Sequence, residues 1–227
     1  MVVFGGRVLF EYGNVTEVSK IASVRKSVLG TLFGKYVAEK PRVLHATVKD
    51  LGLDDMEPFE PIEERATLQD LLMARSGIYF RHADRDGPRK GSVAPGMQFS
   101  YNNWDFNAAG TAFEKLAGQG IYEALEKDLA RPIGMQDYDV AKQKKIQVAP
   151  EKKLWVHPEY AMYLPTRDRA RLGLLMARQG KWKDVYVLPK NWVEYLTTPY
   201  TPASELWPRP LQREFRGTIS RLGYGAM

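Results

Sequence analysis

Ile21-Ala-Ser-Val-Arg-Lys-Ser-Val-Leu-Gly30 is the stretch of sequence around which the rest of the chain can be interpreted. It contains the only Ser-x-x-Lys pattern in the sequence, formed by Ser23 and Lys26, at a position where a helix is expected to begin. Residues three apart on a helix face the same way, so the amine of Lys26 is expected near the hydroxyl of Ser23. Arg25 and Ser27 do not share that face.

A serine hydroxyl becomes a nucleophile only when a base lies beside it and the developing negative charge is stabilised. Lys26 is a candidate for the base, provided that burial and nearby positive groups help it to lose its proton. If Ser23 lies in the first helical turn, the unpaired backbone N–H groups there favour an anion. The alternative is structural: a short pattern arises by chance, and Ser19, Ser23 and Ser27 could be a helix cap and small packing residues.

Composition limits the classes of protein to consider. With 227 residues, of which 44% are hydrophobic and 26% charged, the chain is expected to be a globular protein with one sizeable core over 1–227, or at most two small ones. No apolar run approaches the roughly 18 residues needed to span a membrane. The first seven residues are apolar and then charged, the reverse of a secretory signal. We therefore expect no export signal in this chain, while the compartment stays open, cytoplasmic as written and periplasmic or secreted for a longer parent.

Metal, disulfide and cysteine chemistry is not expected. The chain has no cysteine, which excludes thiolate ligands, disulfides and a cysteine nucleophile. His45, His82 and His157 lack the spacing of metal ligands. No cofactor or metal is predicted.

A net charge of +6 raises the question of nucleic-acid binding. The sequence includes a basic run made of Lys142, Lys144, Lys145, Lys152 and Lys153. This run is interrupted by glutamine and proline and belongs to no recognisable binding module, so we interpret it as a solvated loop and expect no nucleic-acid partner.

Periodicity and turn residues predict the order of the elements. Gly5-Gly6 predicts a hairpin, and Thr67 with Asp70 predicts a capped helix that ends near Ser76-Gly77. The remaining expectations are a buried helix from Ser23 to Pro41 that includes Val24, loops over 51–64, 81–96 and 198–216, helices over 106–116, 121–129, 166–180 (capped by Thr166) and 191–196, and an irregular stretch over 141–160 anchored by Trp155.

Tyr101 and Asn103 lie two residues apart, between a predicted loop and a predicted helix. A phenol can relay a proton, and a carboxamide can donate to and accept from a substrate amide. Both side chains could reach one cleft. The alternative is that Asn102-Asn103 caps the helix while Tyr101 and Trp104 are core residues.

Taken in order, these segments resemble the serine β-lactamase and penicillin-recognising superfamily, on the branch of class C β-lactamases, esterases and 6-aminohexanoate-dimer hydrolases. Ile21-Ala-Ser-Val-Arg-Lys-Ser27 resembles its first motif, and Tyr101-Asn-Asn103 resembles its Tyr-x-Asn motif, preceded by Pro95-Gly96. Other segments also follow the order of the family, namely 67–72 with Ser76-Gly77, 131–135, 166–173, 180–182 and 188–192.

The resemblance implies an α/β (α+β) fold in which an antiparallel sheet is joined to a largely helical subdomain. It implies that Ser23 is the acylated nucleophile, that Lys26 keeps it deprotonatable, and that Tyr101 relays the proton. Asn103 would hold Lys26 and the substrate, and the backbone N–H of Ser23 would form half of an oxyanion hole. The expected substrates are small molecules that carry an ester, an amide or a β-lactam.

One departure from the family concerns its third motif, Lys-Thr-Gly or His-x-Gly. Neither occurs in the sequence, and relatives carry this motif on a strand that follows a segment like Gly223-Tyr224-Gly225. We therefore expect a chain truncated at both ends, with an incomplete sheet that lacks the C-terminal strands. The alternative function is a catalytically inert fragment or a non-catalytic binding homologue.

Overall fold

The structure is a computed structural model that describes residues 1–80, 88–147, 155–202, 205 and 218–220. Among these residues the helices are α1 (Arg25–Glu39), α2 (Leu68–Leu72), α3 (Trp104–Ala117), α4 (Ile121–Leu125), α5 (Thr166–Ala177) and α6 (Lys190–Thr197). Shorter 3-10 turns lie at Ala22–Val24, Pro41–His45, Glu63–Arg65 and Val140–Lys142, and a π-helical turn, Glu126–Ala130, extends α4.

The strands of the described residues pair two by two, and every pair is antiparallel. The pairs are β1 (Val2–Phe4) with β2 (Arg7–Phe10), β3 (Ser19–Lys20) with β6 (Tyr163–Leu164), β4 (Lys144–Ile146) with β5 (Glu159–Ala161), β7 (Lys181–Trp182) with β8 (Val185–Tyr186), and β9 (Pro199–Pro202) with β10 (Thr218–Ser220). The mixed architecture, with small antiparallel sheets and a helical body, confirms the predicted fold class.

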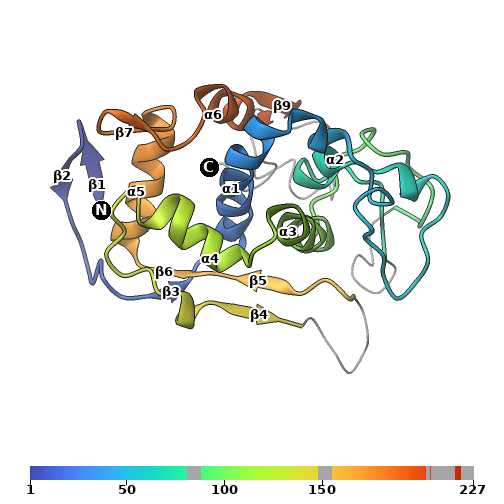
Figure 1. The fold of residues 1–227 in the computed structure, drawn as a ribbon, viewed down its shortest axis with the longest axis horizontal. Coiled ribbons are helices and arrows are strands. Elements are labelled where there is room, and N and C mark those ends of the chain that lie inside the picture. Colours follow the sequence, from blue (N-terminus) through green and yellow to red (C-terminus); the bar gives the residue numbers. More distant parts are fainter. Residues whose placement is uncertain (81–87, 148–154, 203–204, 206–217, 221–227) are drawn as a thin grey trace.

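Helix α1 occupies the middle of the molecule, and the other helices surround it (Figure 1). The extended chain of β5 and β6 runs along one side, and the β1–β2 hairpin lies at one end beside α5. The side chains of Leu29, Leu32 and Phe33 on α1 are at most 1% exposed. Phe33 meets Phe113 of α3 edge to face, with ring centroids 5.2 Å apart. The catalytic candidates at the start of α1 therefore stand on a closely packed part of the core.

Two glycines allow neighbouring elements to approach the central helices closely. A Cβ at Gly34 of α1 would collide with the ring of Trp192 on α6, and a Cβ at Gly110 of α3 would collide with the ring of Tyr160 on β5. Trp192 also donates a hydrogen bond from Nε1 to the carbonyl of Gly30, at 3.1 Å. These contacts hold α6 and β5 against the two helices that carry the candidate site.

Several local predictions are confirmed. The β1–β2 hairpin turns at Gly5-Gly6, both with positive φ. Thr67 and Asp70 form a capping box at the start of α2, and α6 spans the predicted segment. Trp155 is buried.

Other predictions need correction. Val24 is 45% exposed rather than buried, because it lies in the 3-10 turn before α1 begins. The stretch over 141–160 is not irregular throughout, since β4 and β5 pair within it, and β9 starts inside the predicted C-terminal loop. Helix α2 ends at Leu72, before Ser76-Gly77. Pro165, not Thr166, precedes α5, and no side chain caps that helix.

Parts of some predicted loops lie outside the described residues. These parts are 81–87, 148–154, 203–204 and 206–216, together with Lys152 and Lys153 of the basic run.

Candidate active site

Ser23 is held in place by the strand that precedes it. Strand β3 pairs with β6, and the N–H of Ile21 continues this pairing by donating to the carbonyl of Met162, at 3.0 Å. The chain then enters a 3-10 turn at Ala22, whose φ of 45° is left-handed. A non-glycine residue in this region costs on the order of 1 kcal/mol and is typical of functional sites. The turn presents Ser23, half-buried, just before α1 begins.

The serine-cap alternative is not supported at this turn. Neither the 3-10 turn nor α1 has a side-chain cap at its N-terminus, so Ser23 does not serve as a helix cap. Its hydroxyl instead meets two other side chains.

Lys26, the second residue of α1, has a fully buried side chain that points toward Ser23. Its Nζ donates to Ser23 Oγ at 3.3 Å and to Asn103 Oδ1 at 2.8 Å, and it also bonds the hydroxyl of Tyr101. The predicted contact between residues three apart is therefore present.

Tyr101 and Asn103 approach from the turn before α3. The hydroxyl of Tyr101 donates to Ser23 Oγ at 2.7 Å, so Ser23 contacts a phenol and an amine at once. The neighbouring Asn102 has a different role, because its Oδ1 accepts from the N–H of Asp105 at 2.8 Å in the first turn of α3. Asn102 thus bonds the first turn of α3 from the position before its N-cap, Asn103, whose own side chain makes no capping bond and faces Lys26.

The electrostatic environment of Lys26 disfavours its charged form. Burial, and then the neighbouring charge of Arg25, lower the pKa of Lys26 from 10.5 to about 7, while Glu159 and Asp105 oppose that change. A lysine with a pKa near 7 is neutral in a large fraction of molecules at neutral pH. Such an amine can accept a proton from a nearby hydroxyl.

Four further residues of the site, Arg25, Asn107, Glu159 and Lys20, were not predicted from the sequence. Arg25 is 3% exposed and donates from Nη2 to Asn107 Oδ1 at 2.8 Å, and its Nε lies 3.7 Å from Glu159 Oε1. Lys20 also pairs with Glu159, at 2.9 Å. The sequence placed Arg25 off the Ser23 face, and its long side chain nevertheless reaches the same cleft. No local pattern links it to Asn107 or Glu159, because these residues are distant in the chain.

A cleft of about 340 Å³ opens beside Ser23. Besides Ser23 and Ala22, it is lined by Lys20, Arg25, Asn103, Asn107, Trp155 and Glu159. This volume falls within the range of small-molecule sites, about 300–1,000 Å³. Because most lining side chains are charged or carry an amide, the cleft suits a polar ligand.

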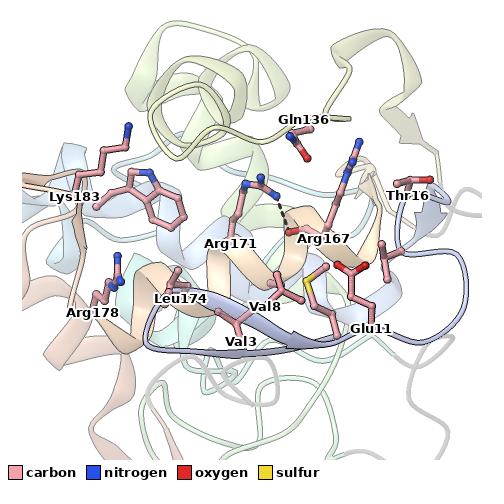
Figure 2. A pocket seen from close by; sticks show the side chains of 15 residues that line it. Val3, Val8, Glu11, Thr16, Gln136, Arg167, Arg171, Leu174, Arg178 and Lys183 are labelled. Atoms are coloured by element: carbon pink, nitrogen blue, oxygen red, sulfur yellow. Dashed lines mark hydrogen bonds between the residues drawn. The ribbon is translucent and has the colours of Figure 1, made fainter.

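A larger cavity, about 540 Å³, lies between the β1–β2 hairpin and α5 (Figure 2). Val3 and Val8 face it from the hairpin, and Arg171 and Leu174 face it from α5. None of the predicted site residues lines this cavity, so it is separate from the candidate active site.

Metal ligands and membrane spans were also sought in the part of the chain that the structure describes. No group of three or more His, Asp or Glu side chains there could hold a metal ion. None of the described helices has the length and apolarity required to cross a bilayer.

The fold and the arrangement at the start of α1 define a protein of the β-lactamase/transpeptidase-like class. A model of the Beta-lactamase family matches residues 1–183, and the chain belongs to that family. No curated protein matches the sequence. The family assignment confirms the resemblance inferred from the sequence motifs.

Solved structures share this fold at low sequence identity. A candidate β-lactamase from Bacteroides dorei is 19% identical, with a TM-score of 0.63, over 87% of this chain and 62% of that one. A candidate 6-aminohexanoate-dimer hydrolase from Bacillus anthracis is 21% identical, with a TM-score of 0.60, over 86% of this chain and 56% of that one. A D-stereospecific amidohydrolase from Streptomyces sp. is 17% identical, with a TM-score of 0.58, over 82% and 66%.

At these identities the similarity establishes the fold alone. The chain covers 48–66% of the length of the similar solved structures.

Proposed function

We propose that residues 1–227 form one hydrolase domain that cleaves an ester, an amide or a β-lactam through an acyl-enzyme on Ser23. The observation that carries this proposal is the convergence of two proton-handling groups on one hydroxyl. Tyr101 OH and Lys26 Nζ lie 2.7 and 3.3 Å from Ser23 Oγ. Membership of the Beta-lactamase family supports a hydrolase.

In the first half of the reaction, Ser23 Oγ attacks the carbonyl carbon of the substrate. Its proton passes to the neutral amine of Lys26, directly or through the Tyr101 hydroxyl that bonds both groups. The carbonyl oxygen becomes an oxyanion, for which the backbone N–H of Ser23 is the expected donor. When the tetrahedral intermediate collapses, the bond to the leaving group breaks and Tyr101 returns the proton to the departing oxygen or nitrogen.

In the second half, water attacks the acyl-enzyme and gives its proton to the same Lys26–Tyr101 pair. Collapse of this intermediate releases the carboxylic acid and returns a proton to Ser23 Oγ, which restores the starting state. Asn103 fixes the amine of Lys26 through its Oδ1, at 2.8 Å. Because Asn103 is exposed, its amide nitrogen is available to donate to the substrate.

A second candidate function is binding without turnover, as in a non-catalytic homologue or an inert fragment. The sequence feature that favours it is the missing Lys-Thr-Gly or His-x-Gly motif. In relatives this motif lies on the strand that supplies the second oxyanion donor. Removing one such donor costs about 10²–10³ in rate.

The test is intact-protein mass spectrometry after incubation with a fluorophosphonate and, separately, with a penicillin. We expect an adduct on the wild type and none on Ser23→Ala. Ser27→Ala is the matched control, because Ser27 Oγ lacks a hydrogen-bond partner among the described residues, and it should be labelled like the wild type. Equal labelling of Ser23→Ala would refute Ser23 as nucleophile. A folded wild type that takes up neither reagent would favour binding without turnover.

A further inference from the structure

Two cations line the cleft beside Ser23, and they share a single carboxylate. Lys20 Nζ lies 2.9 Å from Glu159 Oε1, and Arg25 Nε lies 3.7 Å from the same oxygen. All three side chains belong to the wall of the cleft. Among the described residues of that wall, the positive charges therefore outnumber the negative one, and the cleft is electrostatically suited to an anion.

The guanidinium of Arg25 has more donors than it uses. Its side chain is only 4% exposed, and a guanidinium carries five N–H groups. Among the described residues it makes one hydrogen bond, from Nη2 to Asn107 Oδ1 at 2.8 Å, because 3.7 Å to Glu159 is too long for another. A buried charge is unfavourable unless its partners compensate for the lost hydration. Arg25 is therefore well placed to bind an acceptor that enters the cleft.

Other groups of the wall also offer donors. Trp155 is 8% exposed, and its Nε1 has no hydrogen-bond partner among the described residues. Asn103 already accepts from Lys26 through its Oδ1, so its amide nitrogen is the group that it can offer to a ligand. Apart from the carboxylate of Glu159, the wall thus offers mainly donors. A ligand that complements it has acceptor oxygens and a negative charge.

We propose that the cleft binds a carboxylate of the substrate through Arg25 and Lys20. The ester, amide or β-lactam that is cleaved would then carry a carboxylate elsewhere in the same small molecule, because Ser23 lines the same cleft. A carboxylate can accept two parallel hydrogen bonds from one guanidinium, which makes such a contact both strong and directional. The inference rests on the proposed function and deepens it, because hydrolysis at Ser23 does not by itself require a charged substrate.

A purely structural role for the three charged residues makes a different prediction. Glu159 of β5 could simply tie Lys20 of β3 and Arg25 of α1 together. In that case Glu159→Gln would loosen the wall and weaken the binding of any ligand. If the cations instead bind a substrate carboxylate, Glu159→Gln removes a competing negative charge and strengthens the binding of acids alone.

The experiment measures binding by NMR titration of the full 227-residue chain that carries Ser23→Ala, so that no turnover is needed. The probes are the mono-N-methylamides of succinic, glutaric and adipic acid, which cover three separations between amide and carboxylate. Each is compared with the neutral compound in which a primary amide replaces the carboxylate. The added variants are Arg25→Gln, Lys20→Gln and Glu159→Gln. Arg131→Gln is the matched control, because it removes the same charge from an exposed arginine that does not line the cleft.

We expect the best-fitting acid to bind about ten- to a hundredfold more tightly than its neutral counterpart. Arg25→Gln should remove about tenfold or more of this preference. Lys20→Gln should remove about two- to fivefold, since the side chain of Lys20 is 39% exposed. Glu159→Gln should increase the preference, and Arg131→Gln should preserve it. The neutral compounds should bind all four variants alike.

Equal affinities for acids and neutral compounds at all three lengths, or no binding of either, would overturn the inference, as would a preference that persists in Arg25→Gln. If Arg25→Gln does not fold, Lys20→Gln and Glu159→Gln decide, because they should change the preference in opposite directions. A preference for acids in a protein whose Ser23 is never labelled by a fluorophosphonate would reject the hydrolase and keep the carboxylate site. Labelled Ser23 without that preference would do the reverse.

Discussion

Replacing Lys26 by Met should stabilise the folded chain, and the gain should depend on pH. Met has a similar volume and carries no charge, so it can fill the same buried space. In the unfolded chain Lys26 has its ordinary pKa of 10.5, and in the folded chain burial and Arg25 lower it to about 7. Folding therefore expels a proton from this side chain, at an energetic cost that Met does not have.

The direction in which the stability of the wild type changes with pH follows from the two pKa values. Between about pH 7 and 10.5 the unfolded chain binds more protons at this side chain than the folded chain, so the stability of the wild type rises with pH through that window. The penalty is fully present below the folded pKa and vanishes above the unfolded one. Linkage gives an advantage of Met over Lys of about 4 kcal/mol at pH 7 and about 2 kcal/mol at pH 9.

The assay is urea unfolding of the wild type and of Lys26→Met at pH 7, 8 and 9, with free energies taken from linear extrapolation. Loss of the hydrogen bonds to Tyr101 and Asn103 changes the size of the gain at every pH, but it does not change the slope. A difference in free energy that stays constant from pH 7 to pH 9 would refute the lowered pKa of Lys26. The same variant should lose labelling at Ser23, because it removes the base.

Three further predictions follow from single contacts. Tyr101→Phe should slow fluorophosphonate labelling by about 10²–10⁴-fold, measured as a rate by mass spectrometry, while the protein stays folded by circular dichroism. Thr67→Ala removes the capping box of α2 and should lower the free energy of unfolding by about 1 kcal/mol in urea, and no loss would contradict the cap. Gly110→Ala should destabilise by about 1–3 kcal/mol because its Cβ meets Tyr160, whereas Gly173→Ala in α5, with nothing within 4 Å, should stabilise by about 0.5–1 kcal/mol. Equal melting temperatures for the two alanine variants would contradict this packing.

The core of the site could be predicted from the sequence because its signals are local. Ser23 and Lys26 are one helical turn apart, and Tyr101 and Asn103 belong to one short motif. Spacing in the sequence does not predict that the Ser23–Lys26 pair contacts the Tyr101–Asn103 pair, since Lys26 and Tyr101 are 75 positions apart. The family resemblance supplied that contact at the sequence level, and the helix packing of α1 against α3 accounts for it physically.

The errors concern segments whose structure depends on distant partners. Residues 144–146 look like a charged loop because two of the three are lysines, and they become β4 only by pairing with β5. Helical spacing predicts that Arg25 does not share the face of Ser23. Its side chain is long enough to return to the cleft, and its partners Asn107 and Glu159 lie on α3 and β5.

Features that disfavour folding gather in a few residues at the start of α1. Ala22 has a left-handed φ, Lys26 is a fully buried amine, and Arg25 is a guanidinium with a shared counter-ion. Packing alone would favour a glycine at position 22 and apolar side chains at positions 25 and 26. Their concentration beside one half-buried serine has a chemical explanation, because a strained turn fixes the hydroxyl, and burial together with the charge of Arg25 lowers the pKa of the Lys26 amine. If this region served only to hold α1 in place, nothing would offset the unfavourable contributions of these three features to the free energy of folding.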